Sequence, residues 1–186
     1  MTMEIREAKP SDAELILKIY SHYVTDTCVS FETEVPSIEE FASRIENTIK
    51  SYPYLVCEID EKIVGYAYGS KYREREAYRY SAEVSVYVVP EYHRRGIGRA
   101  LYAKLFELLK EQGIYTAYAG ITVPNYNSVG LHKAMGFREV GIYKNVGYKF
   151  GTWLSSLWVE KPLRAYDNPI AKRGDMTGKQ GDIRFV

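Results

Sequence analysis

Residues 82–99 read AEVSVYVVPEYHRRGIGR, and this stretch decides the fold class. Its first eight residues are rich in β-branched and aromatic types and stop at Pro90, which is typical of a strand that ends before a turn. Apolar residues at helical spacing then run from 98 to 112, and Gly113 follows where a helix C-terminus favours glycine. The unit therefore predicts a strand, a basic glycine-containing turn and an amphipathic helix.

The turn in this unit has the composition of a phosphate-binding site. Gly96 and Gly98 let the backbone approach an anion closely, and the first N–H groups of a helix have no partner inside it. A Walker A motif is absent, and a dinucleotide fingerprint would need Gly or Ala where Leu101 stands. A lone GxG would favour an ordinary tight turn, but the strand, the basic run and the helix around it favour a pyrophosphate site.

On both sides of this unit, the apolar pattern predicts further strands and helices. Two S-x-x-E capping boxes, at Ser11 and Ser37, predict helix starts that follow Pro10 and Pro36. The pair Asp60-Glu61 predicts a hairpin turn. The expected strands cover residues 3–8, 54–59, 62–72, 82–89, 115–123, 137–146 and 148–160, and the expected helices end near residues 23, 51, 112 and 135. This order predicts an α/β fold with a mixed sheet covered by helices.

Length and charge restrict the organisation and the partners of the chain. Its 186 residues suit one domain, predicted at 1–163, with a polar tail at 164–186. A net charge of +1 gives no electrostatic reason to bind nucleic acid or an anionic membrane. No signal peptide is expected and no apolar run approaches the roughly 20 residues of a membrane span, so we expect a cytoplasmic protein. The three histidines and the two cysteines lack metal-ligand spacing, so no metal is expected.

Two blocks of sequence resemble the GNAT superfamily of acetyltransferases. HRRGIGR at 93–99 resembles motif A, [Q/R]-x-x-G-x-[G/A], with His93 at the Q/R position, and NYNSVGLHKAMGF at 125–137 resembles the second conserved block. The resemblance implies a mostly antiparallel sheet of about seven strands flanked by about four helices, and acetyl-CoA as cosubstrate. Residues 82–88 and 147–153 also resemble the phosphinothricin N-acetyltransferase group, which acts on methionine sulfone and methionine sulfoximine and usually forms homodimers.

An amine must lose its proton before it attacks a thioester, because an alkyl ammonium has a pKa near ~10. The resemblance implies that Glu83 is this base, directly or through water, and that His132 protonates the thiolate. A backbone N–H of residues 87–89 would stabilise the oxyanion. The resemblance implies that CoA is bound by Val86, Tyr87, Val88, His93, Arg94, Arg95, Gly96, Ile97, Gly98, Arg99, Asn125 and Ser128.

The acceptor amine is less well defined by the sequence. The carboxylate of an amino acid favours an arginine fork, and Arg79 is the first candidate, followed by Arg73 and Arg75. Phe31 and Tyr78 are candidates for the pocket wall. The alternatives are a GNAT enzyme for a polyamine, an aminoglycoside or a protein N-terminus, and a CoA-binding sensor without catalysis. Cys28 and Cys57 are expected to be structural, since neither shows a paired base.

Overall fold

One seven-stranded sheet, in the order β1-β2-β3-β4-β5-β7-β6, forms the centre of the computed structural model, which describes residues 3–167 and 169. All neighbouring strands are antiparallel except β4 and β5. The strands are β1 Met3–Glu7, β2 Tyr54–Ile59, β3 Lys62–Lys71, β4 Ser81–Val88, β5 Thr116–Val123, β6 Arg138–Lys149 and β7 Thr152–Pro162. The helices are α1 Ala13–Thr25, α2 Ile38–Ile49, α3 Ile97–Glu111 and α4 Tyr126–Ala134, with short 3-10 turns at Pro10–Asp12, Glu76–Tyr78 and Pro90–Tyr92. The predicted fold class is confirmed.

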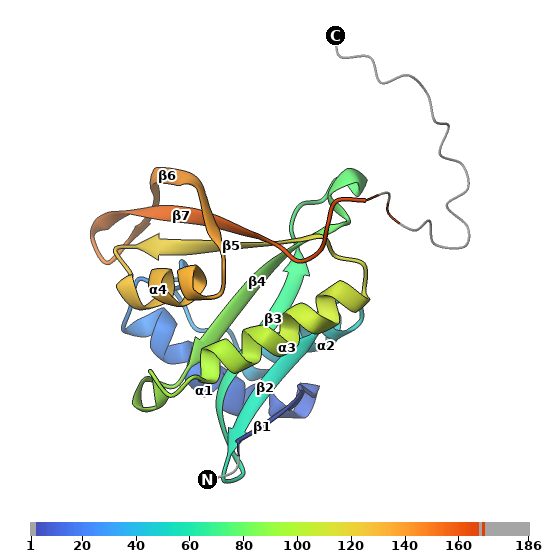
Figure 1. The fold of residues 1–186 in the computed structure, drawn as a ribbon. Helices are drawn as coiled ribbons and strands as arrows, with labels where there is room; N and C mark the ends of the chain where they lie inside the picture. Colours follow the sequence, from blue (N-terminus) through green and yellow to red (C-terminus); the bar gives the residue numbers. More distant parts are fainter. Residues whose placement is uncertain (1–2, 168, 170–186) are drawn as a thin grey trace.

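Helices cover both faces of the sheet, as Figure 1 shows. The helix α3 buries Leu101, Leu105 and Leu109 against one face, together with apolar residues of β2, β4 and β5. On the other face, α1 and α2 bury Ile16, Ile45 and their neighbours against a layer of tyrosines from β2 and β3. Both cores come from amphipathic helices that turn one apolar stripe towards the sheet.

The parallel pair β4 and β5 separates soon after it begins. Residues 81–83 of β4 pair with residues 116–118 of β5, whereas β4 stays paired with β3 along residues 82–88. Beyond Tyr118, the partner of Glu83, β5 pairs only with β7. The separation leaves one edge of β4 without a strand partner in the middle of the sheet, and the candidate site lies there.

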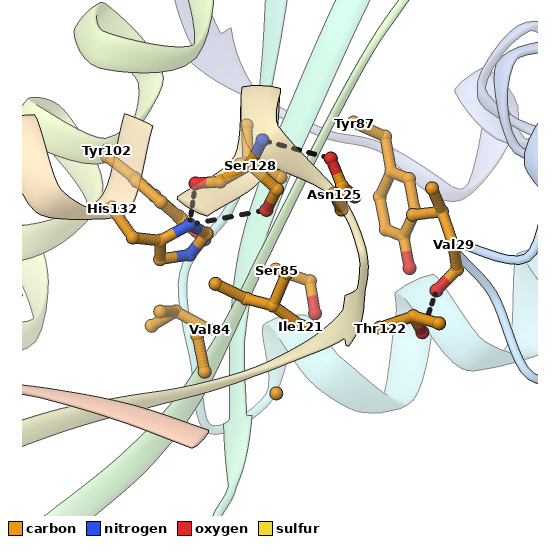
Figure 2. A pocket seen from close by; sticks show the side chains of 13 residues that line it. Val29, Val84, Ser85, Tyr87, Tyr102, Ile121, Thr122, Asn125, Ser128 and His132 are labelled. Atoms are coloured by element: carbon orange, nitrogen blue, oxygen red, sulfur yellow. Dashed lines mark hydrogen bonds between the residues drawn. The ribbon is translucent and has the colours of Figure 1, made fainter. Parts of the chain in front are cut away.

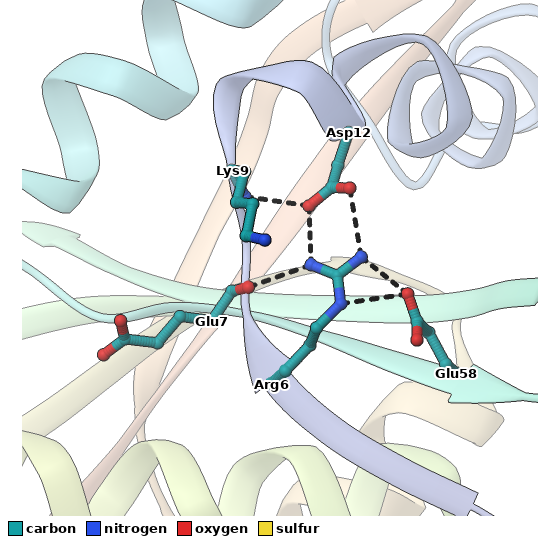
Figure 3. A network of polar contacts seen from close by, with 5 residues as sticks. All are labelled: Arg6, Glu7, Lys9, Asp12 and Glu58. Atoms are coloured by element: carbon teal, nitrogen blue, oxygen red, sulfur yellow. Dashed lines mark hydrogen bonds and ion pairs between the residues drawn. The ribbon is translucent and has the colours of Figure 1, made fainter. Parts of the chain in front are cut away.

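The two predicted helix caps have different outcomes. Ser37 accepts a hydrogen bond from the N–H of Glu40 at 3.1 Å, so the second cap is confirmed. The capping box at Ser11 is wrong, because α1 begins at Ala13 with Asp12 in the cap position and without a side-chain cap bond. The carboxylate of Asp12 instead accepts the Lys9 N–H at 2.8 Å and two hydrogen bonds from Arg6, which also contacts Glu58 (Figure 3).

The turn between the last two strands lies later than predicted. It falls at Phe150 and Gly151, which both have positive φ, whereas the sequence pattern suggested Gly147. Gly147 lies within β6. The ring of Phe31 occupies the space where a Cβ would lie, which explains the glycine at this position. The predicted hairpin turn at Asp60-Glu61 is confirmed, with φ of 48° and 65°.

The segment after β7 begins by packing on the chain itself. Tyr115 donates a hydrogen bond to Asp167 at 2.7 Å, and Tyr166 lies 2.9 Å from the hydroxyl of Thr116. Most of the predicted tail, residues 168 and 170–186, lies outside the described residues.

Candidate active site

A cavity opens where β4 and β5 separate (Figure 2). Residues of β4 and β5 form two of its walls, α4 with the Tyr102 side chain of α3 forms a third, and Val29 from the segment after α1 closes it. A second cavity adjoins it between residues 27–29 and the start of α4, and the two share Val29, Thr122 and Asn125. Together they form a path from the surface to the open edge of β4.

The backbone of β4 supplies polar groups to this edge. Val89 donates its N–H to the carbonyl of Val64 at 2.9 Å, so it points towards β3 and cannot serve as an oxyanion donor. Because alternate residues of a strand present their backbone groups to opposite edges, Tyr87 also faces β3, while Val86 and Val88 face the gap. The carbonyl of Val88 accepts from Tyr23 and His93. The N–H groups of Val86 and Val88 are thus the two placed to bind an oxyanion.

The turn before α3 forms an anion-binding concavity. Arg94 has a φ of 62° and Gly96, the N-cap of α3, has a φ of 81°. Successive residues in such conformations aim their N–H groups at one point, and the helix N-terminus adds positive potential. Arg94, Arg95 and Arg99 are all exposed around the turn. This geometry is suited to an anion such as a pyrophosphate, and binding at residues 94–99 stays a prediction.

His93 adopts a position that its motif did not indicate. Its Nε2 lies 2.9 Å from the carbonyl of Val88 and 3.1 Å from the hydroxyl of Tyr23 on α1. The ring therefore ties the turn to the end of β4 and to α1, and this face of the ring is not directed at a phosphate. His93 holds the turn in place through these contacts.

Asn125 and Ser128 lie at the start of α4, where both line the first cavity. The Oδ1 of Asn125 caps α4 by accepting the N–H of Ser128 at 3.1 Å. The cap role and a binding role are compatible, because the amide N–H₂ group of Asn125 is a separate donor. The hydroxyl of Ser128 lies 3.4 Å from Nδ1 of His132.

His132 is buried and forms a hydrogen-bonded pair with Tyr102. Its Nδ1 lies 2.8 Å from the carbonyl of Ser128, which can only accept, so Nδ1 carries the proton. Burial lowers the pKa of His132, so the neutral ring has an unprotonated Nε2 that accepts from the Tyr102 hydroxyl at 3.0 Å. Both side chains line the cavity (Figure 2). Tyr102 was not among the predicted site residues, because the spacing of Tyr102 in α3 is that of an ordinary core residue.

Glu83 is the last residue of β4 that pairs with β5, opposite Tyr118. Its side chain is half-buried, and burial raises the pKa of the carboxyl. It does not line the cavity itself but adjoins the lining residue Val84 at the closed end of the gap. A half-buried carboxylate with a raised pKa has the properties of a general base.

The predicted arginines and Tyr78 lie just before β4, at the end that holds Glu83, whereas Phe31 lies against β6, and none of these residues lines the cavity. The guanidinium of Arg73 lies over the rings of Tyr72 and Tyr78, at 5.1 and 5.5 Å. Arg79 pairs with Glu76 at 2.8 Å and donates to the Tyr80 hydroxyl. Arg75 is exposed at the start of the short turn, and Phe31 packs on Gly147 of β6. Arg79 also lies over the ring of Tyr80, at 4.8 Å, whereas Arg73 lies over Tyr72, which itself stacks on Tyr118 of β5.

Residues 3–167 and 169 contain neither a metal site nor a membrane-spanning helix. No group of three His, Cys, Asp or Glu side chains there is placed to hold a metal ion. No helix in residues 3–167 is long and apolar enough to cross a membrane.

Known proteins with similar sequences and structures are consistent with this geometry. A family model described as acetyltransferase (GNAT) domain matches residues 5–158. A phosphinothricin N-acetyltransferase of Streptomyces coelicolor is 40% identical over 165 residues, or 87% of this chain and 96% of the relative. An L-methionine sulfoximine/L-methionine sulfone acetyltransferase of Salmonella typhimurium is 32% identical, covering 91% and 99%. The structure of a phosphinothricin acetyltransferase from Sinorhizobium meliloti in complex with acetyl-CoA matches with a TM-score of 0.88 and 33% identity, covering 94% and 97%.

Proposed function

Since the chain belongs to the GNAT acetyltransferase family and is an acetyl-CoA-dependent N-acetyltransferase, we propose that it acetylates the primary amine of a small amino-acid-like substrate. The relatives named for phosphinothricin and for methionine sulfone and sulfoximine support acceptors of this type. The observation that carries the proposal is the open edge of β4, with an anion-binding turn at one end and a half-buried glutamate at the other.

We propose one orientation for acetyl-CoA in the two connected cavities. Its pyrophosphate would bind the N–H groups of residues 94–99, and its pantetheine arm would pass Asn125 and Ser128 along the edge of β4. The thioester carbonyl would then lie near the N–H groups of Val86 and Val88. Acetyl-CoA supplies the acetyl group and the thiol leaving group, and the residues of the chain bind it and move protons.

We assign the first proton transfer to Glu83. Its carboxylate accepts a proton from the acceptor ammonium, directly or through water, and the free amine attacks the thioester carbon. The new C–N bond places negative charge on the thioester oxygen, which the N–H of Val86 or Val88 stabilises. The attacking nitrogen is positively charged after the C–N bond forms and loses its second proton to water. The C–S bond then breaks as the carbonyl forms again.

The second proton transfer uses the pair of Tyr102 and His132. Before this step the neutral Nε2 of His132 takes up a proton from water. In this protonated form Nε2–H donates to the Tyr102 oxygen, and the Tyr102 O–H is then available to the sulfur. The Tyr102 proton passes to the sulfur and the His132 proton passes to the Tyr102 oxygen. The products are the CoA thiol, an intact tyrosine and a neutral histidine. Because burial lowers the pKa of His132, its imidazolium is a strong proton donor.

The acceptor carboxylate would bind at the 72–80 segment, near the end of the gap that holds Glu83. Arg73 is the preferred partner because aromatic rings hold its guanidinium, while Arg79 already pairs with Glu76 and Tyr80. Phe31 and Tyr78 would contribute apolar contacts. Several arginines in one acceptor segment favour an anionic acceptor over a polyamine or an aminoglycoside.

We also propose that two copies associate through the β6 edge of the sheet. β6 is an edge strand whose residues are almost all exposed, and large apolar side chains gather on it and on the adjoining turn and β7. They are Val140, Ile142, Tyr143, Val146, Tyr148, Phe150 and Trp153, each more than half exposed. A long apolar edge strand favours association with another chain. Light scattering of the purified protein should give twice the chain mass, and a Tyr148→Glu/Trp153→Glu variant should give the mass of one chain.

Residues 1–163 would form the catalytic domain, with the 164–186 tail added to it, and the need for acetyl-CoA suits the cytoplasm. The function is tested by following thiol release from acetyl-CoA with a panel of amines. The panel contains methionine sulfone, methionine sulfoximine, phosphinothricin, spermidine, an aminoglycoside and a short peptide. Turnover with the first three supports the proposal, whereas turnover restricted to the last three would replace the acceptor. CoA binding without any turnover would favour a sensor.

A further inference from the structure

Lys149, the last residue of β6, is a buried cation outside the machinery described so far. Its side chain is 4% exposed, and its Nζ donates to the carbonyl of Ser30 at 2.8 Å, across 119 residues of sequence. The ammonium also lies over the ring of Phe150 at 4.9 Å. A lysine in this position connects the far edge of the sheet to the segment between α1 and α2.

Burying an ammonium against a neutral carbonyl is unfavourable compared with burying an apolar side chain of the same length. Burial accordingly lowers the pKa of Lys149, while Cys28 and Glu32 favour its charged form. A position that only filled space would be served better by methionine. The ammonium therefore has a role that depends on its hydrogen bond to Ser30.

Ser30 is the point at which several elements hold this segment. Its hydroxyl lies 2.8 Å from that of Tyr20 on α1 and accepts the N–H of Glu32 at 3.1 Å. The carbonyl of Ser30 is held by Lys149 from the opposite side. Ser30 is itself buried, so a change in Lys149 would be transmitted to the residues on either side of it.

Those neighbours are Val29 and Phe31. The carbonyl of Val29 accepts from the Thr122 hydroxyl at 3.3 Å, and its side chain faces the cavity beside Tyr87 (Figure 2). The ring of Phe31 rests on Gly147, so closely that an added Cβ would lie 2.5 Å from it. β6 therefore fixes two successive residues of this segment, Ser30 through Lys149 and Phe31 through Gly147.

We propose that Lys149 is a positioning residue for the acceptor amine: through Ser30 it sets Val29 and Phe31 as the wall of the reaction site. Val29 also lines the cavities assigned to acetyl-CoA, but the cofactor has a further attachment at the turn before α3, whereas the acceptor is small and depends on the shape of the wall. Loss of the Lys149 ammonium therefore weakens acceptor binding more than acetyl-CoA binding. This inference rests on the proposed function for the identity of the acceptor.

The test compares Lys149→Met with Lys144→Met, which removes an exposed lysine from the same strand. The expected result for Lys149→Met is a rise in the acceptor KM of roughly ten- to a hundred-fold, as for a lost charge-assisted hydrogen bond, with acetyl-CoA affinity changed less than about twofold. Lys149→Arg should recover part of the acceptor KM, and Lys144→Met should match the wild type. An unchanged acceptor KM, or an equal loss of affinity for both substrates, would overturn the proposal.

Hydrogen exchange separates this proposal from the proposed function, because it needs no acceptor. In Lys149→Met the amides of residues 28–32 should exchange faster than in the wild type, while those of α3 stay unchanged. If no amine of the panel is acetylated by the wild type, the acceptor class fails but this exchange result still tests the role of Lys149. Unchanged exchange at 28–32 would reject that role whatever the acceptor is.

Discussion

The two ends of the β4 gap are built in different ways. At the proposed cofactor end, the turn before α3 presents backbone N–H groups that come from consecutive residues, 94–99. At the acceptor end, the wall comes from side chains of the 72–80 segment, the segment after α1 and β6, which are distant in sequence. The difference indicates that cofactor binding tolerates side-chain changes that would alter acceptor binding.

Glu83→Gln should have the largest effect, because it removes the base and leaves the cofactor end intact. The value of kcat should fall by about 10²–10⁴, while the Kd for acetyl-CoA stays within about twofold. A base works only when it is ionised, so wild-type kcat/KM should fall as pH drops through the raised pKa of Glu83. This acid limb should lie above the ordinary glutamate range. Full turnover by the variant would remove Glu83 from the mechanism.

The cofactor end could be predicted from sequence because its information is local. A strand, a glycine turn and a helix within residues 82–112 specify the geometry, and the order of elements along the chain followed from the same periodicity. The position of β7 between β5 and β6 in the sheet was not predicted. The acceptor end could not be predicted, since nothing near Lys149 shows that its ammonium reaches Ser30. The partner of His132 was hidden for the same reason: its Nε2 accepts from Tyr102, 30 residues earlier. The helix start at Ser11 was wrong because Arg6 and Lys9 engage the next residue, Asp12.

Tyr102→Phe should rank second, because it interrupts the proton path while the cavity keeps its shape. We expect kcat to fall by roughly 10–10² with little change in either KM. The Nε2 of His132 loses its partner in this variant, so the pH profile should also change. Tyr52→Phe, the same change at a tyrosine that does not line the cavity, is the matched control. A variant with wild-type kcat would leave thiolate protonation to another group.

Arg73→Met tests the acceptor end alone. Loss of a charge-assisted contact to a carboxylate should raise the KM of an amino-acid acceptor by about ten- to thirty-fold, with acetyl-CoA KM unchanged. The control is Arg138→Met, which removes an arginine of β6 that pairs with Glu160 of β7. It should have no such effect. An acceptor ester or amide should lose affinity for the wild type but not for Arg73→Met. If both proteins discriminate against the ester equally, another residue binds the carboxylate.

Gly96→Val tests the cofactor end alone. No atom lies within 4 Å of an added Cβ, so the effect would come from the backbone, since φ is +81°. A β-branched residue in this region costs about 1–3 kcal/mol, and the strain should raise the acetyl-CoA KM by roughly tenfold. The acceptor KM should stay constant. Gly130→Ala, in the open surface of α4, is the control, because its added Cβ also meets nothing within 4 Å.

Asp12→Asn should have the smallest effect on catalysis, because Arg6, Asp12 and Glu58 join β1, β2 and the start of α1 away from both ends of the gap. Arg6 holds the pKa of Asp12 below its ordinary value, so the stabilisation is present above the unfolded pKa of about 3.9 and is lost as pH falls through the lower folded pKa. Urea unfolding at pH 7 should show a loss of about 2 kcal/mol that shrinks in acid, with both KM values unchanged. A stability difference that persisted below pH ~2 would mean that packing rather than charge makes Asp12 important. A change in either KM would mean that this network also shapes the gap, and the two ends would then not be independent.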